Sequence, residues 1–298
     1  MPMTDHVRAE FGRLLAEIRP KLHRYCARMV GSAIDGEDIV QDAMINALDA
    51  LATVGTIDNA AGWLFRIAHN TALDSLRRHA REPLMSPAED LTMIAADEPP
   101  ENGEEIAVMS LRTFLGLPAL QRSAVILKDV LGHSIEEISS ITGASPAAAK
   151  SALQRGRVRL RQLAAESEVV DLPPLSEEVG ARLAAYVNGF RTGDFDAVRQ
   201  MLADDVKLDL VGKLSAQGKG SVGQYYGRYA AAAEHWAYAP GVAEGRPAML
   251  VFDRNVSLEA PAYFIALTFD CGRVAAIHDF LFARYAMEGV DLLPWNAG

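Results

Sequence analysis

Cysteine is scarce in this sequence, and long apolar runs are absent. Its 298 residues include only Cys26 and Cys271, which are far apart and have no cluster of histidines beside them. This pattern argues against a disulfide framework and against a zinc site. No stretch approaches the roughly eighteen apolar residues of a membrane span, and the start MPMTDHVRAEFGRLL lacks the basic and apolar segments of a signal peptide. We therefore expect a cytoplasmic protein without a metal or other cofactor.

Basic charge is also in short supply. The net charge is −10, and residues 1–166 hold 18 Lys and Arg against 22 Asp and Glu. This acidity does not exclude a nucleic-acid partner, because binding depends on local clustering of charge. Residues 66–81 and 150–161 are locally basic. An acidic chain of this kind is expected to bind free DNA poorly.

Two segments rich in proline or acidic residues divide the chain. Residues 83–105 are dominated by proline, glycine and acidic side chains, and residues 167–175 contain Pro173 and Pro174. Both are typical of solvated linkers. We therefore expect a multi-domain protein with domains at 1–82, 106–166 and 176–298. Helical periodicity predicts all-α folds for the first two.

The first domain is predicted to contain three helices. They cover about residues 7–29, 35–51 and 60–81, and Asp35 is the expected N-cap of the second. Asp38, Gln41 and Asp42 lie on the polar face of the second helix. A mixed, mainly basic stripe runs along the third, at Trp63, Arg66, Asn70, Asp74, Arg77 and Arg78. Taken alone, both faces could simply be solvated, and Trp63 could be a core residue.

The second domain carries the pattern of a helix-turn-helix. Ser134 and Glu137 form a capping box, and Gly143 suits the left-handed residue that ends a short helix. Ser145 and Pro146 then open a longer helix. Its outward face holds side chains suited to base edges and phosphates: Ala147, Lys150, Ser151, Gln154 and Arg155, continued toward the backbone by Arg157, Arg159 and Arg161. A plain helical hairpin with a solvated charged face is the alternative.

The third domain is predicted to be α+β, because helices precede a run of strands. Helices are expected at the start and near residues 220–236. Strands are expected at 206–210, 248–252, 262–269 and 274–285, with a hairpin turn at Cys271 and Gly272. The glycine-rich and lysine-rich segment 212–227 is assigned to a loop after the first strand.

Three stretches of the first two domains resemble the extracytoplasmic-function class of the sigma-70 family. GEDIVQDAMINALDAL is similar to the polymerase-binding helix of sigma domain two, and AGWLFRIAHNTALDSLRRHAR to the adjoining helix that captures the minus-ten element. LPALQRSAVILKDVLGHSIEEISSITGASPAAAKSALQRGRVRLRQL resembles sigma domain four, a helix-turn-helix that reads the minus-thirty-five element. The resemblance implies core RNA polymerase and promoter DNA as partners.

The resemblance also implies roles for particular residues. Asp38, Gln41 and Asp42 would face polymerase. The stripe of the third helix would line the minus-ten single strand, with a base pocket and a positive groove. Lys150, Ser151, Gln154 and Arg155 would meet the minus-thirty-five duplex.

The third domain resembles the SnoaL-like, ketosteroid-isomerase-like cone fold through YVNGFRTGDFDAVRQMLADDVKLDL. That fold implies an apolar pocket for a small-molecule ligand, with Asp209, His278 and Asp279 as candidate lining residues. Neighbours in a strand point to opposite faces, so only one of His278 and Asp279 can enter the pocket. A structural role is favoured for each of them, and no catalysis is predicted.

Three functions remain open at this stage. The first is a sigma factor regulated in cis by its C-terminal domain. The second is a sigma factor fused to an active isomerase, cyclase or hydrolase, which a desolvated carboxylate hydrogen-bonded to a pair of donors would support. The third is a helix-turn-helix repressor with a ligand-sensing domain, which the polymerase-binding motif opposes.

Overall fold

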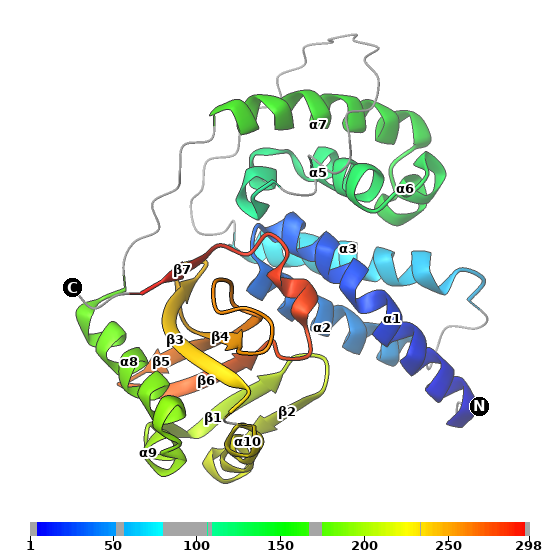
Figure 1. Ribbon diagram of the computed structural model, residues 1–298. Coiled ribbons are helices and arrows are strands. Elements are labelled where there is room, and N and C mark those ends of the chain that lie inside the picture. The colour runs from blue at the N-terminus through cyan, green and yellow to red at the C-terminus, as the bar shows by residue number, and fades with distance from the viewer. Residues whose placement is uncertain are drawn as a thin grey trace. The chain divides into compact units, whose positions relative to one another are not determined.

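The computed structural model describes residues 5–51, 57–79, 106, 109–166, 175–232 and 234–295. The chain divides into two compact units, Met1–Val169 and Val170–Gly298. Each unit has a hydrophobic core of its own. Figure 1 shows the helices of the first unit and the helices and sheet of the second. Apart from Leu175, the two predicted linkers lie outside the described residues.

The first unit begins with three helices, α1 (Asp5–Val30), α2 (Ala33–Leu51) and α3 (Ala60–His79). Gly31 takes a positive φ of 74° and ends α1. The side chain of Ser32 then accepts a hydrogen bond from the backbone N–H of Asp35, 3.0 Å away. Ser32 therefore caps α2, and the prediction that Asp35 is the N-cap was wrong. The tight turn at Gly31 starts the helix about one turn earlier than the charge pattern indicated.

The remainder of the first unit is the predicted helix-turn-helix and the helices before it. Its elements are the 3-10 helix η1 (Leu111–Gly116), α5 (Ala119–Val125), the π-helical segment η2 (Ile126–Val130), α6 (Ile135–Thr142) and α7 (Pro146–Glu166).

The capping box of the helix-turn-helix is confirmed. The hydroxyl of Ser134 accepts from the N–H of Glu137 at 3.1 Å, and the Glu137 carboxylate accepts from the N–H of Ser134 at 2.7 Å. Gly143 ends α6 with a φ of 73°, and Ser145 accepts from the N–H of Ala148. These predictions hold because each of them depends on residues within one helical turn.

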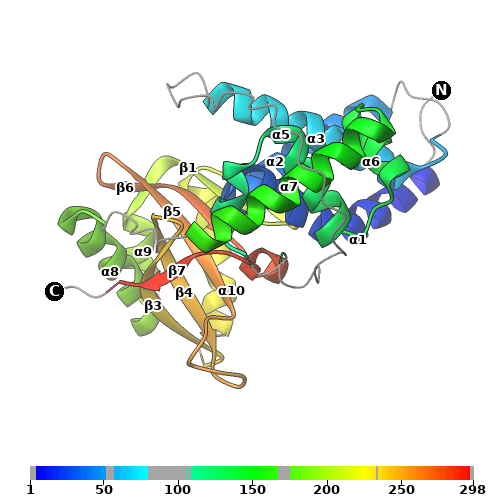
Figure 2. The same cartoon turned by 90° about the horizontal axis from the view of Figure 1, so that it is seen from above.

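The two parts of the first unit share a single core. Buried side chains of α1, α2 and α3 join those of η1, α5, η2, α6 and α7 in one hydrophobic cluster. The views in Figures 1 and 2 both place α6 beside α3. This packing arrangement was not predicted from the sequence.

The second unit combines helices with one curved sheet. Its helices are α8 (Glu177–Thr192), α9 (Phe195–Gln200), α10 (Lys219–Ala231) and the 3-10 helix η3 (Arg284–Met287). Its strands are β1 (Leu202–Leu210), β2 (Leu214–Gln217), β3 (Trp236–Ala243), β4 (Arg246–Asp253), β5 (Tyr263–Asp270), β6 (Arg273–Asp279) and β7 (Leu292–Pro294).

The sheet order is β2-β1-β6-β5-β4-β3-β7. Neighbouring strands are antiparallel except β1 and β6, which run parallel. Helices α8 and α10 pack against the sheet, and aromatic side chains fill the space between them. The predicted α+β fold of the third domain is confirmed.

Three local predictions for this unit were wrong. Helix α10 ends at Ala231, and Trp236 begins strand β3 instead of ending a helix. The segment 212–227, assigned to a loop, contains β2 and the start of α10, because Leu214–Gln217 pair with β1. Strand β6 stops at Asp279, well before residue 285. Strand pairing across the sheet decided these boundaries, and a local pattern contains no information about that pairing.

Candidate nucleic-acid interface

Helix α7 presents a polar outer face. Ala147, Lys150, Gln154 and Arg155 are exposed and Ser151 is half-buried, whereas Ala149, Leu153, Gly156 and Leu160 on the other side are buried. A Cβ atom on Gly156 would come within 2.7 Å of Val125, so glycine permits close packing of α7 on α5. The polar face is thereby held outward by a firmly packed helix, as duplex recognition requires.

Two of the predicted phosphate contacts on α7 differ in their surroundings. The guanidinium of Arg155 donates to the Ser151 hydroxyl at 3.0 Å and stays on the exposed surface. Arg157 instead makes a two-pronged ion pair with Asp129, at 2.9 Å from Nε and 2.5 Å from Nη2. Asp129 lies in η2, so Arg157 ties α7 to the preceding helices. Its contact with a backbone phosphate stays a prediction.

Helix α3 presents the second polar face. Arg66, Asn70, Asp74, Arg77 and Arg78 are exposed, and Asp74 and Arg77 form an ion pair at 2.9 Å. The opposite side of the helix buries Leu64, Ala68 and Ala72. Trp63 is half-buried and packs against the hydrophobic cluster. Arg81, where the third helix was predicted to end, lies outside the described residues.

Helix α2 has an exposed surface that is both acidic and apolar. Asp38 and Asp42 are exposed and Gln41 is half-buried. Ile45 and Leu48 beside them are 50% and 43% exposed. Two large apolar side chains that stay in water on one helix are typical of a surface that meets another protein.

The second unit contains a buried carboxyl group surrounded by tyrosines. Asp279 is fully buried, and its Oδ2 accepts from the hydroxyls of Tyr225 at 2.5 Å and Tyr229 at 2.7 Å. Its Oδ1 accepts from the backbone N–H of Leu281 at 2.9 Å. Burial raises the pKa of Asp279, and these hydrogen bonds partly oppose the shift. We call Asp279, Tyr225, Tyr229, Tyr238 and Tyr263 the tyrosine cluster.

Two other members complete this cluster. The Tyr229 hydroxyl hydrogen-bonds that of Tyr263 at 3.0 Å. Tyr238 is only 6% exposed, yet among the described residues its hydroxyl has no hydrogen-bond partner. Burial raises the pKa of Tyr238 to about 12. A buried hydroxyl without a partner is costly, so this atom is suited to meeting an acceptor or a water molecule.

The other two candidate pocket residues lie elsewhere. Asp209 of β1 pairs in register with His278 of β6, and both are half-buried. The Asp209 carboxylate accepts from the Ser215 hydroxyl at 3.0 Å. Asp279 alone of the three points into the aromatic interior, as expected for the neighbour of His278 in a strand.

Sequence reasoning missed the tyrosines. Tyr225 and Tyr229 stand four residues apart on α10 and therefore share one face. This spacing was a usable signal. Nothing local connected them to Asp279, which lies 54 residues after Tyr225 and 50 after Tyr229. Within the described part of the chain, no group of three or more His, Cys, Asp or Glu residues is placed to hold a metal ion.

The segments of the chain that carry the α2, α3 and α7 faces match known family models. Residues 14–82 match the family model of Sigma-70 region 2, and residues 111–160 match that of Sigma-70 region 4. The ECF RNA polymerase sigma factor SigM of Mycobacterium tuberculosis is 33% identical over 52% of this chain and 78% of its own length. This chain belongs to the extracytoplasmic-function sigma factors.

Two further similarities extend into the C-terminal unit. The ECF RNA polymerase sigma factor SigG of Mycobacterium tuberculosis is 26% identical over 93% of this chain and 82% of its own. The solved structure of the Mycobacterium tuberculosis sigma factor SigJ covers 91% of this chain and 95% of its own, with 20% identity and a TM-score of 0.35.

As a sigma factor, the protein binds core RNA polymerase and promoter DNA and directs promoter-specific transcription initiation. No helix among the described residues has the length and apolar character needed to cross a bilayer.

Proposed function

We propose that this sigma factor reads promoters with two separate faces and is regulated in cis by its C-terminal unit. Residues 1–82 act as sigma domain two and 106–166 as sigma domain four, joined by the linker 83–105. The linker 167–175 connects them to a regulatory domain at 176–298. The chain acts in the cytoplasm, together with its polymerase.

The observation that carries this proposal is the outward face of α7. Ala147, Lys150, Ser151, Gln154 and Arg155 meet the minus-thirty-five duplex. Lys and Arg suit guanine edges and phosphates, and Gln suits adenine, and each good base contact discriminates by about 1–3 kcal/mol. Because the face is exposed, it can enter a major groove without rearrangement inside the helix-turn-helix.

The α3 face serves the minus-ten element. Trp63, Arg66, Asn70, Asp74, Arg77 and Arg78 line the path of the single strand, where basic side chains follow the backbone and polar groups read bases. On α2, Asp38, Gln41 and Asp42 contact polymerase. The exposed Ile45 and Leu48 supply the apolar part of that contact.

Footprinting of the polymerase holoenzyme on a promoter tests the two faces separately. Gln154→Ala is expected to weaken protection at the minus-thirty-five element and leave strand opening near minus ten intact once the complex forms. Asn70→Ala is expected to leave protection at the minus-thirty-five element intact and to weaken strand opening near minus ten. Loss of both signals in both variants would oppose separate roles for the two faces.

The tyrosine cluster supports a second role, that of a small-molecule site in the regulatory domain. Asp279 is a desolvated carboxyl held by a pair of tyrosine donors, and the Tyr238 hydroxyl supplies a further buried donor. This arrangement suits a flat apolar molecule with a carbonyl or hydroxyl oxygen. It is also the arrangement that favours proton transfer, and hence the enzyme alternative.

The variant Tyr238→Phe distinguishes a role of Tyr238 in ligand binding from a purely structural role. The variant removes one hydroxyl that has no partner, so we expect unchanged or slightly greater stability. Binding of small phenols and cyclic ketones, followed by the fluorescence of nearby Trp236, should weaken several-fold. Equal binding by both proteins would remove Tyr238 from the site. Turnover of a bound ketone that is lost in Asp279→Asn would favour the enzyme alternative.

A further inference from the structure

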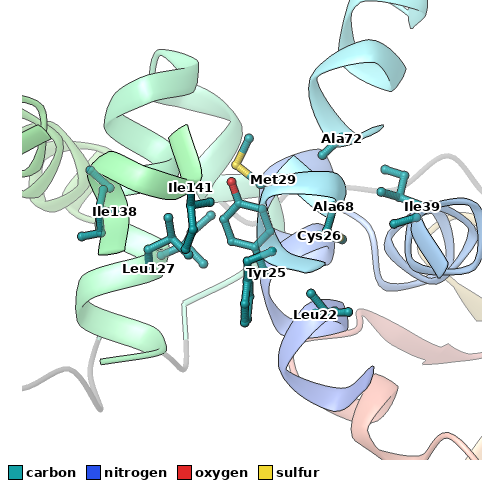
Figure 3. Packing of buried hydrophobic residues seen from close by; sticks show 14 of the residues in the cluster. Leu22, Tyr25, Cys26, Met29, Ile39, Ala68, Ala72, Leu127, Ile138 and Ile141 are labelled. Carbon is teal, nitrogen blue, oxygen red and sulfur yellow. The ribbon is translucent and has the colours of Figure 1, made fainter. Parts of the chain in front are cut away.

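One acidic side chain interrupts the basic face of α3. The members of this face are exposed and recur at helical spacing: Arg66, Asn70, Asp74, Arg77 and Arg78. Figure 3 shows Ala68 and Ala72, from the opposite side of the helix, among buried side chains of α1 and α2. Asp74 is therefore held on the outer side of a packed helix, in the middle of the proposed minus-ten face.

Neither packing nor helix stability explains an aspartate at this position. The side chain of Asp74 is 66% exposed, and aspartate is a poor residue for the interior of a helix. Its ion pair with Arg77 joins two exposed side chains, and such pairs add little to stability. The carboxylate also repels the phosphates that the neighbouring arginines attract. On a surface that binds DNA, this acid is unfavourable unless it makes a contact of its own.

One carboxylate oxygen of Asp74 is available for such a contact. Its Oδ1 accepts from Nη1 of Arg77 at 2.9 Å, which fixes the orientation of the carboxylate. Within the described residues its Oδ2 accepts no hydrogen bond, and the side-chain amide of Asn70, one turn earlier, makes none. An ionised carboxylate can only accept hydrogen bonds. The group that meets Oδ2 on the DNA must therefore be a donor.

The donors of single-stranded DNA are on its bases. The phosphodiester backbone offers only acceptor oxygens. Cytosine, adenine and guanine carry exocyclic amino groups, whereas thymine presents the carbonyl oxygens O4 and O2. In an unpaired strand these groups are open to the protein. A carboxylate therefore favours a base with an amino group and is repelled by the carbonyl oxygens of thymine.

We infer that Asp74 is a specificity-determining residue of the minus-ten face. Its Oδ2 accepts from the amino group of one unpaired cytosine, adenine or guanine, and it disfavours thymine at that position. Arg66 and Arg78 supply the attraction to phosphate, which does not depend on the sequence. The inference rests on the proposed minus-ten role of α3 and adds the base chemistry that this face selects.

Fork-junction DNA bound to the polymerase holoenzyme tests the inference. The DNA has a paired minus-thirty-five region and an unpaired strand at minus ten, in which each position holds each of the four bases in turn. For the parent we expect one position at which thymine binds about fivefold or more weakly than the best base with an amino group. Asp74→Asn keeps the size of the side chain and adds an amide donor that suits a thymine carbonyl. The penalty for thymine should therefore largely disappear at that position alone.

The direction of the change distinguishes this role from that of a solvated charge. If Asp74 only repels phosphate, Asp74→Asn binds every sequence more tightly and its preference among bases is unchanged. That result would overturn the inference. The matched control is Asp196→Asn, because Asp196 forms the same kind of i,i+3 ion pair with Arg199, at 2.6 Å, in α9 of the other unit. The control should equal the parent in affinity and in base preference.

Arg78→Ala separates a failure of the inference from a failure of the proposed face. If α3 binds the single strand, this variant should weaken binding of all the sequences to a similar degree and lower the salt slope by up to about 0.7. With that result, an unchanged base preference in Asp74→Asn would overturn the inference alone. No change of affinity in either variant would overturn the minus-ten role of α3, and the inference with it.

Discussion

Tyr25 of α1 and His69 of α3 share a hydrogen bond of 2.6 Å between Oη and Nδ1, in a region closed to water. Burial lowers the pKa of His69 to about 4, from an ordinary value of 6.5. The ring is therefore neutral at pH 7 and must stay neutral for the packing to persist. The burial of His69 makes the first unit sensitive to acid.

Acid should destabilise the first unit through His69. The unfolded chain binds a proton near pH 6.5 and the folded chain only near pH 4, so the His69 contribution is complete above pH 6.5 and falls as the pH drops toward 4. The full shift corresponds to roughly 3 kcal/mol. Urea unfolding, followed by Trp63 with the other two tryptophans replaced by Phe, should show a weaker pH dependence in His69→Asn. Identical pH profiles would contradict this assignment.

Arg155→Ala tests the minus-thirty-five face. Loss of one phosphate contact should lower affinity for promoter DNA in the holoenzyme and reduce the slope of log K against log salt by up to about 0.9. Arg112→Ala, outside the proposed face, should change neither quantity. Unchanged affinity and slope in Arg155→Ala would remove this residue from the interface.

The apolar surface of α2 predicts a polymerase contact. Replacing Ile45 and Leu48 with serine should weaken binding to core polymerase at least several-fold. Both side chains are already about half exposed, so stability should change little. Val256→Ser, at an 80% exposed position in the other unit, is the control. Undiminished affinity of the double variant in a titration with labelled core enzyme would show that this surface faces elsewhere.

Asp279 should make the second unit less stable as the pH rises. Its folded pKa is raised, so the folded state holds a proton that the unfolded state releases above the ordinary carboxyl pKa. Stability contributed by the neutral form is present at low pH and is lost as the pH rises through the folded pKa. Asp279→Asn should remove this decline in urea unfolding followed by Trp236 and Trp295. The control variant Asp209→Asn, on the paired strand, should keep the loss of stability at higher pH. If the loss of stability persisted in Asp279→Asn, another titrating group would be its cause.

Local motifs were the part of the structure that the sequence could predict. The capping box of Ser134 and Glu137 and the left-handed Gly143 act within one turn, so their spacing was sufficient. Ser32 displaced Asp35 as a cap because a turn at Gly31 set the start of α2. The ion pair of Arg157 was not predicted, because its partner, Asp129, lies 28 residues earlier in the chain.

The candidate sites also differ in whether local sequence could predict them. The faces of α3 and α7 follow from helical periodicity and were predicted residue by residue. The tyrosine cluster depends on tyrosines of α10 meeting Asp279 of β6. The packing of the two parts of the first unit depends on Tyr25 meeting Ser123, 98 residues away. Contacts across such distances arise from tertiary packing, which no local spacing encodes.

Run-off transcription tests the central claim most directly. Core RNA polymerase is combined with the full chain, or with the chain truncated after Ala165, on DNA that carries a promoter selected by the holoenzyme. The account predicts a discrete transcript that requires the sigma factor and whose yield changes on truncation. No sigma-dependent transcript from either protein would contradict promoter-specific initiation, and equal yields would contradict regulation in cis.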